Sequence, residues 1–152
     1  MKTLAHPGDK DELVHRLRRL QPDSVRHWGR MSAHQMVCHL NDSLLVATGQ
    51  RAASPAISLP SRTIIKWIAL YLPLRWPPGI LTRPEIDQEA GGTRPIDFAA
   101  DVALQVALIE DVAGQPRKLR GSVHPIFGRM SERTWLRWAY LHTDHHLRQF
   151  GE

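Results

Sequence analysis

The chain has 152 residues with 20 Lys or Arg against 15 Asp or Glu, which gives a formal net charge of +5 when the histidines are neutral. This length predicts one domain over residues 1–152, and a 42% hydrophobic composition excludes wholesale disorder. The single cysteine, Cys38, excludes an internal disulfide and a zinc knuckle built from cysteines. Nine histidines are the unusual feature of the composition.

The first residues and the apolar runs bear on where the protein resides. The start of the chain has no apolar core of the kind that a secretory signal needs, so we expect none. The richest apolar run, Ile64 to Leu74, contains Lys66 and Pro73 and is shorter than the ~20 residues of a membrane span. We therefore predict a cytoplasmic protein without a membrane span, and we expect this run to pack over the helices or in a dimer interface.

Apolar spacing predicts the helices, and polar caps predict where they begin. The first helix should begin at Asp9 and end before Pro22. The second should begin at Ser32, which forms a capping box with Gln35, and continue to about Gly49. The residues expected to face inward from the second helix are Met36, His39, Leu40, Ser43, Val46 and Ala47.

The middle of the chain, from Gln50 to Pro95, carries seven prolines and predicts a long crossover with one short helix at residues 62–72. The third main helix should span Asp97 to Gly114, and the last should span Ser131 to Phe150. The third helix is expected to face inward through Ala99, Val102, Ala103, Val106, Ile109 and Ala113. Because no long segment alternates with period two, we predict an all-α, antiparallel four-helix bundle without a sheet.

His142 and His146 lie four residues apart in the last predicted helix. On a helix this spacing points the two imidazoles within ~40° of one another and separates them by ~6 Å along the axis, so that they can bind one metal ion. His39 occupies the inward stripe of the second helix. Three neutral imidazoles from two helices leave a fourth position open for water or substrate, as in catalytic zinc sites. We expect zinc or nickel, since imidazole suits both ions.

Other interpretations of these histidines are open at this point. A buried histidine is more often a hydrogen-bonded core residue than a ligand, and this applies to His39 taken alone. Two close imidazoles without a shared ligand are costly to bury, which favours the metal site for the pair. His145, three residues after His142, competes with His146 for the ligand position but is expected to point away from His39.

Two polar residues lie one turn after predicted ligands. Gln149 follows His146 by three residues and is expected to orient a ligand imidazole or a metal-bound water. Asp42 follows His39 by three residues and is expected to accept the free N–H of that imidazole. Either residue can also be an ordinary polar side chain of a helix, and for Asp42 this is the better interpretation.

The sequence offers two candidates for a catalytic group other than the metal. No residue is a clear general base, and the candidates are His145 and His124. His124 precedes a proline, and packing within a loop is its more frequent role. Cys38 points ~100° around the helix from His39 and is expected in the core.

Basic residues cluster in the first helix and in the late loop. They are Arg16, Arg18, Arg19, Arg117, Lys118 and Arg120. Such clusters bind phosphates, but no nucleic-acid-binding module accompanies them, so we expect a solvated surface. Two other function classes are stronger: a metal-dependent enzyme that acts on a small molecule, and a non-catalytic metal- or ligand-binding module.

Two motifs resemble those of the DinB-like (YfiT-like) metal-binding four-helix bundles. Residues 28–40 read WGRMSAHQMVCHL and resemble the second-helix motif of that superfamily, and residues 142–149 read HTDHHLRQ and resemble its last-helix motif. The segments HPIFG at 124–128 and WPPG at 76–79 are similar to one branch of it, a domain of unknown function. The resemblance covers nearly the whole chain.

The resemblance implies an up-and-down bundle, often dimeric, in which His39, His142 and His146 hold a divalent ion. Relatives in the superfamily use such an ion to activate a low-molecular-weight thiol, in S-transfer or in thiol-dependent isomerisation. The resemblance therefore implies a metal-dependent thiol S-transferase or a related hydrolase as the activity. The common ending His-His-Arg-Gly-Gln is here HHLRQ at 145–149, a departure that leaves the substrate class open.

Overall fold

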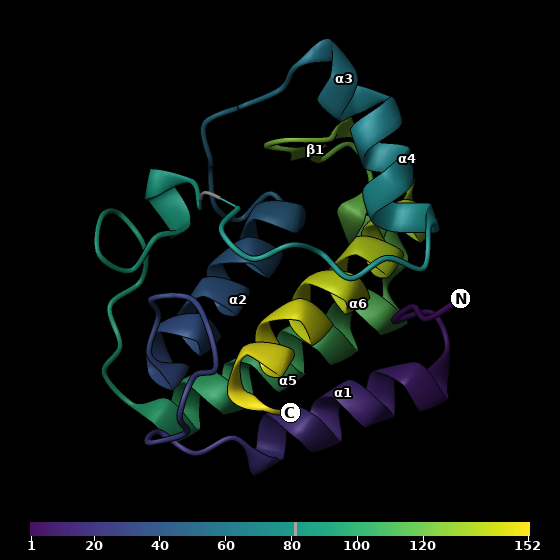
Figure 1. Ribbon diagram of the computed structural model, residues 1–152. Coiled ribbons are helices and arrows are strands. Elements are labelled where there is room, and N and C mark those ends of the chain that lie inside the picture. Colours follow the sequence, from purple (N-terminus) through teal and green to yellow (C-terminus); the bar gives the residue numbers. More distant parts are fainter. Residues whose placement is uncertain (81) are drawn as a thin grey trace.

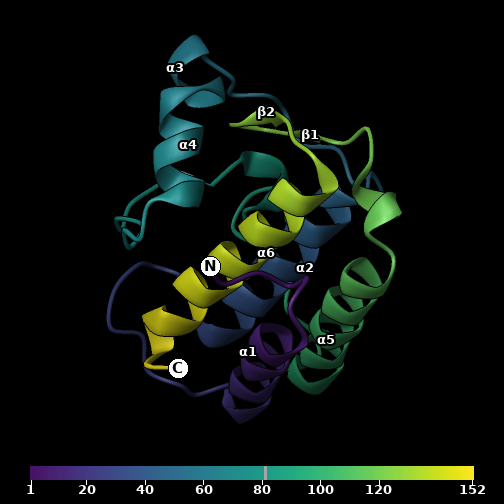
Figure 2. The ribbon, with the colours of Figure 1, turned by 90° about the vertical axis from the view of Figure 1, so that its right-hand side faces the viewer.

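Long helices make up most of the fold. The computed structural model describes residues 1–80 and 82–152, and it confirms a mostly helical chain. The long helices are α1 (Pro7–Arg19), α2 (Ala33–Ala47), α5 (Phe98–Gly114) and α6 (Glu132–Leu147). α1 contacts α5 and α6, and α2 contacts the same two helices (Figure 1, Figure 2). The two helices that carry the predicted metal ligands, α2 and α6, are therefore packed against each other.

The crossover between α2 and α5 carries short helical segments. They are α3 (Leu59–Arg62), α4 (Ile64–Tyr71) and the 3-10 turn η1 (Pro84–Ile86). The short helix predicted at 62–72 is confirmed as α4, but helical structure begins earlier, in α3. Thr63 separates the two because its φ of −122° and ψ of −93° are not helical. α4 packs on α6 above the long helices (Figure 1).

A small hairpin contradicts the expectation that the chain has no sheet. β1 (Val123–His124) and β2 (Gly128–Arg129) pair antiparallel, with His124 opposite Gly128. Strands of two residues are too short to produce an alternating pattern, so periodicity cannot reveal them. The hairpin lies beside α3 and α4 in both views (Figure 1, Figure 2).

The predicted helix starts are confirmed except for the first. Ser32 caps α2 through its capping box, and Asp97 and Ser131 cap α5 and α6. α1 begins at Pro7 rather than at Asp9, because proline is well suited to the first helical position. The 3-10 turns η2 (Pro116–Leu119) and η3 (Arg148–Phe150) follow α5 and α6.

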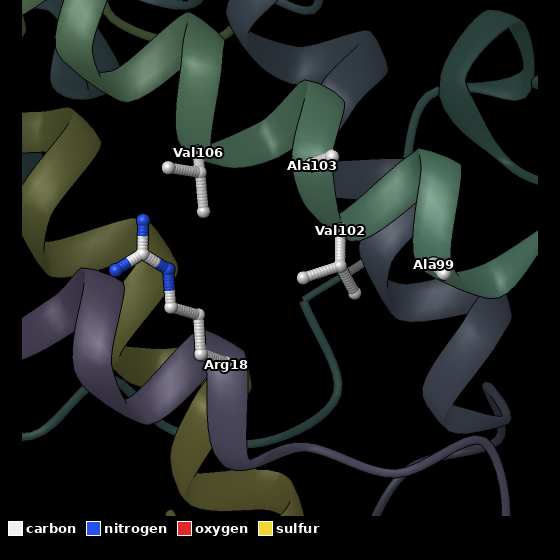
Figure 3. Close-up of a pocket in the computed structure, with 5 residues that line it drawn as sticks. All are labelled: Arg18, Ala99, Val102, Ala103 and Val106. Carbon is white, nitrogen blue, oxygen red and sulfur yellow. The ribbon is translucent and has the colours of Figure 1, made fainter.

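The buried faces of α2 and α5 differ from the predicted stripes in different ways. α2 is buried on nearly every side, including its predicted stripe, because α5, α6, η1 and β1 all contact it. The buried residues of α5 are Gln105, Leu108, Ile109 and Val112. Much of the predicted α5 stripe instead lines a shallow hollow of about 260 Å³, into which Arg18 extends from α1 (Figure 3). Gln105 is polar but fully buried, so the apolar pattern of the sequence did not indicate which face of α5 points inward.

Exposed apolar side chains gather on α3 and α4, and ion pairs occur elsewhere on the surface. The large apolar side chains exposed on α3 and α4 are Leu59, Ile64, Ile65, Trp67, Ile68 and Tyr71. Among the described residues, no helix is both long and apolar enough to cross a membrane. Most of the clustered basic residues are paired: Arg16 with Asp144, Arg19 with Glu152, Lys118 with Asp111 and Arg120 with Glu132. These ion pairs support a solvated surface rather than a phosphate-binding one.

A buried carboxylate ties the crossover to α2. Asp42 accepts hydrogen bonds from Arg51 Nη1 at 2.7 Å and from Gln88 Nε2 at 3.0 Å. It also accepts from the backbone N–H and the hydroxyl of Thr93, at 2.8 and 2.6 Å. Arg51 donates in turn to two backbone carbonyl oxygens of the same loop. Because η1 lies within this loop, the clamp fixes η1 against α2.

Replacing Asp42 by alanine should lower the free energy of unfolding by about 3 kcal/mol, because Arg51 and the amide donors lose their buried acceptor. Urea unfolding followed by circular dichroism measures the change. The control Asp23→Ala removes an exposed carboxylate and should change the free energy by less than about 0.5 kcal/mol. A loss below about 1 kcal/mol for Asp42→Ala would contradict the clamp.

Candidate metal centre

Three imidazoles from two helices meet between α2 and α6. His39 comes from α2, and His142 and His146 come from successive turns of α6. Nε2 of His142 lies 3.2 Å from Nε2 of His39 and 3.2 Å from Nε2 of His146. The three nitrogens lie within 4.8 Å of one another. The structure therefore brings together the three histidines that the sequence singled out as a possible metal site.

The outer ring nitrogens determine how two of these imidazoles are oriented. His39 Nδ1 donates to the carbonyl oxygen of Ile86 in η1 at 2.9 Å, and His146 Nδ1 donates to Gln149 Oε1 at 2.6 Å. A carbonyl oxygen can only accept, so each Nδ1 carries the hydrogen and each Nε2 presents a lone pair toward the centre. Outer contacts of this kind orient the histidines of metal sites.

A count of lone pairs favours a cation at the centre. In the neutral cluster only His142 is free to carry a hydrogen on Nε2, and one hydrogen cannot satisfy both neighbouring lone pairs at once. In a tetrahedral zinc site with Zn–N bonds of ~2.05 Å, the ligand nitrogens lie ~3.3 Å apart. The two Nε2–Nε2 distances of 3.2 Å are close to that separation. The residues present therefore fit a divalent ion.

Burial keeps the three imidazoles neutral. It lowers the pKa of His39, and it lowers the pKa values of His142 and His146 well below the usual value for histidine. Repulsion between charged rings adds to the effect for His142 and His146. Because a metal ion binds the neutral form, the burial that disfavours protonation leaves the nitrogens available for coordination.

His145 takes a different position from His146. Its ring packs against Trp28 and Trp76, with centroids 4.8 and 5.8 Å away. Burial lowers the pKa of His145 to about 4, and its buried Nδ1 has no hydrogen-bond partner among the described residues. The three-nitrogen cluster contains His146. His145 therefore lies beside the cluster, and no described residue makes a hydrogen bond to its Nδ1.

Of the two residues predicted beside the ligands, Gln149 lies there and Asp42 does not. Gly29, with φ +83°, packs so closely on Gln149 that a Cβ at this position would lie 2.6 Å from Gln149 Nε2. Asp42 was expected to accept the free N–H of His39, and this expectation is wrong, since the Ile86 carbonyl accepts it. The Asp42 side chain faces the crossover, where the loop supplies donors for all of its hydrogen bonds.

A cavity of about 1050 Å³ adjoins the three histidines. Its walls come from α2, α4, α6, the segment 28–31, the crossover and the β1–β2 hairpin. The aromatic side chains that line it are Trp28, Trp76, Phe127, Trp135 and Trp138, and Trp138 also stacks on His142 at 4.8 Å. A mostly apolar hollow of this size suits a small organic molecule.

The charged groups of the cavity wall are mainly guanidiniums. Arg30 pairs with Asp87, so its charge is balanced. Arg75 and Arg83 also line the cavity, and neither makes an ion pair within residues 1–80 and 82–152. Arg83 donates its Nη2 to Ser54 Oγ at 2.6 Å, and its buried Nε has no hydrogen-bond partner in that part of the chain. The cavity is therefore suited to a ligand that carries negative charge.

His124, considered as a general base, lies in the cavity wall but is held by the hairpin. Its Nδ1 accepts hydrogen bonds from the backbone N–H groups of Ile126 and Phe127, both at 3.1 Å. The ring stacks on Phe127 and contacts Trp135 and Trp138. Burial lowers the pKa of His124 to about 3. These contacts correspond to the loop-packing role.

The His124 site should make folding sensitive to acid. As the pH falls from 6.5 toward 3, the unfolded chain binds a proton at this position that the folded chain does not, so the free energy of unfolding decreases. His124→Asn keeps an acceptor for the two N–H groups and removes the titration. Between pH 6.5 and about 5, the free energy of unfolding should fall by about 1.5 kcal/mol less for this variant than for wild type. Urea unfolding at several pH values measures both decreases. The control His15→Asn, exposed on α1, should follow wild type. An unchanged pH dependence for His124→Asn would contradict this role.

Some groups of the site were not predicted. The acceptor of the His39 Nδ1 hydrogen is the backbone carbonyl of Ile86, and the type of a residue does not indicate what its backbone will bind. Arg83 lies in the proline-rich crossover, far in sequence from the histidines. A second cluster of ligand-type side chains, His34, Cys38 and Asp101, was also missed. Its available signal was the four-residue spacing of His34 and Cys38.

Comparisons with known proteins identify the family of the chain. Comparison with curated proteins and with solved structures gives no match. A family of proteins of unknown function, DUF1569, matches residues 3–152. The chain therefore belongs to the DUF1569 family of proteins of unknown function.

Proposed function

We propose that the protein binds a divalent metal ion through His39, His142 and His146 and uses it to transform a small molecule in the adjoining cavity. One observation carries the proposal: three Nε2 atoms converge, and two of the rings have their Nδ1 hydrogens held by fixed acceptors. The family match supplies no activity, and the support for the proposal comes from the site itself.

Zinc or nickel is the ion that we propose. Imidazole suits both, and affinity for nitrogen ligands is high among the late first-row metals. A divalent ion supplies Lewis acidity, which lowers the pKa of a water molecule or thiol beside it. Thiol S-transfer and hydrolysis are therefore the reaction classes that we propose for this site.

His145 is the side chain that we propose as the proton acceptor or hydrogen-bonding group for the substrate. Its Nδ1 is buried without a partner in the described residues, and its ring packs against two of the tryptophans that line the cavity, Trp28 and Trp76. His124, the other candidate, already uses its Nδ1 for two backbone N–H groups. Gln149 orients His146 and thereby acts as a positioning residue.

Elemental analysis of protein purified without a histidine tag tests the ligand set. His39→Ala, His142→Ala and His146→Ala should each contain one metal equivalent less than wild type, because each removes one of three donors. His15→Ala, which removes an exposed imidazole of α1, should keep the wild-type content.

Equal metal content in wild type and the three ligand variants would contradict the proposal. Circular dichroism of each variant checks that the helices persist. Protein with the metal ion bound should also turn over a substrate in a panel of thiols and esters. Stoichiometric metal with no turnover would favour a non-catalytic metal-binding module.

The wall of the cavity supports an apolar substrate with an anionic group. Apolar side chains provide most of the contact surface, and Arg75 and Arg83 provide positive charge without an ion-pair partner in the described chain. A carboxylate in the cavity would pair with either guanidinium. Charge-assisted hydrogen bonds of this kind are stronger than neutral ones.

Two ligands of the same shape test this substrate class. Naphthaleneacetate should quench tryptophan fluorescence with an affinity roughly tenfold higher than naphthaleneethanol, because only the former pairs with a guanidinium. Arg83→Gln should remove this difference by weakening the acetate alone. The control Arg133→Gln, exposed on α6, should preserve it. Equal affinities of wild type for the two ligands would overturn the anionic preference.

The arrangement of the four long helices as a bundle is also part of what we propose. The contacts of α1 and α2 with α5 and α6 support an antiparallel four-helix bundle of the DinB-like kind. A homodimer, which the resemblance implies, stays a prediction.

A further inference from the structure

A second cluster of metal-binding side chains lies between α2 and α5. His34 Nε2 lies 2.7 Å from Asp101 Oδ2, and Cys38 Sγ lies 3.4 Å from the same oxygen. The three ligand atoms lie within 4.8 Å of one another. Cys38 and His39 point ~100° apart around α2, so one contributes to this cluster and the other to the three-histidine site.

The packing of two helices produces the cluster. His34 and Cys38 are four residues apart and lie on one face of α2, and Asp101 lies in the first turn of α5. Asn41, one turn after Cys38, donates its Nδ2 to the Asp101 carbonyl oxygen at 3.1 Å. Its buried Oδ1 has no hydrogen-bond partner among the described residues. The α2–α5 interface therefore holds three ligand types in place, and the same interface contains a buried oxygen that no described residue satisfies.

The distances are close to those of a mononuclear site. In a tetrahedral zinc site the sulfur and oxygen ligands lie ~3.5 Å apart, and the observed Cys38–Asp101 separation is 3.4 Å. The His34–Asp101 separation of 2.7 Å is that of a hydrogen bond and must lengthen by roughly 0.6 Å to admit an ion. Both of these side chains are 18% exposed, so an ion can enter from solvent and small rotations can open the pair.

We propose that His34, Cys38 and Asp101 form a second divalent-cation site, of the zinc class, that cross-links α2 to α5. Zinc accepts nitrogen, sulfur and oxygen ligands in one site, and solvent completes the coordination. On binding, the ion takes the place of the Cys38 thiol hydrogen, which leaves as a proton to solvent. The site is independent of the three-histidine centre, although both use neighbouring residues of α2.

Cobalt(II) is the probe, because Cys38 is the only cysteine of the sequence. A thiolate-to-cobalt charge-transfer band in the near ultraviolet therefore reports this site alone. Titration of metal-free wild type with Co²⁺ should produce the band, and Cys38→Ser should abolish it. His34→Ala should shift the titration midpoint to a concentration roughly tenfold higher or more, since it removes one of three protein ligands.

His39→Ala is the matched control, since it removes a ligand of the three-histidine centre and leaves all three residues of this cluster. Its thiolate band should equal that of wild type, which separates the two proposals. A wild-type protein that binds Co²⁺ without a thiolate band would overturn the second site and leave the first intact. If Cys38→Ser does not fold, the presence of the wild-type band and its weakening in His34→Ala decide the question.

Discussion

The fold turns three imidazole nitrogens toward one another and gives two of the rings fixed acceptors on their outer side. The Ile86 carbonyl holds the hydrogen of His39, and the Gln149 amide holds that of His146. Those hydrogen bonds leave lone pairs rather than hydrogens at the centre, in surroundings that disfavour a charged imidazole. A cation is the partner that satisfies all three nitrogens, and the rest of the site depends on this constraint.

Distant parts of the chain maintain the arrangement. The crossover supplies Ile86, and the hydrogen bonds of Asp42 and Arg51 keep that loop against α2. The segment before α2 holds Gln149, since His27 donates its backbone N–H to the Gln149 carbonyl oxygen at 2.7 Å. The same two segments line the cavity. The groups that orient the imidazoles are therefore also the groups that shape the space for a substrate.

Local signals explain what the sequence could predict. Two features depend on helix geometry within a few residues: the spacing of His142 and His146, and the capping box of Ser32. The sequence could therefore predict both. The acceptor of His39 is a backbone oxygen in a loop 47 residues away, which no side-chain pattern encodes. The inward face of α5 was misassigned because a buried Gln105 interrupts its apolar pattern. Both failures concern tertiary contacts, which periodicity does not describe.

The most direct test is a crystal structure of zinc-loaded protein with diffraction recorded at the zinc absorption edge. We expect an anomalous peak ~2.1 Å from each Nε2 of His39, His142 and His146, with the cavity on its open side. A map of zinc-saturated crystals with ordered histidines and no peak among those three nitrogens would contradict it.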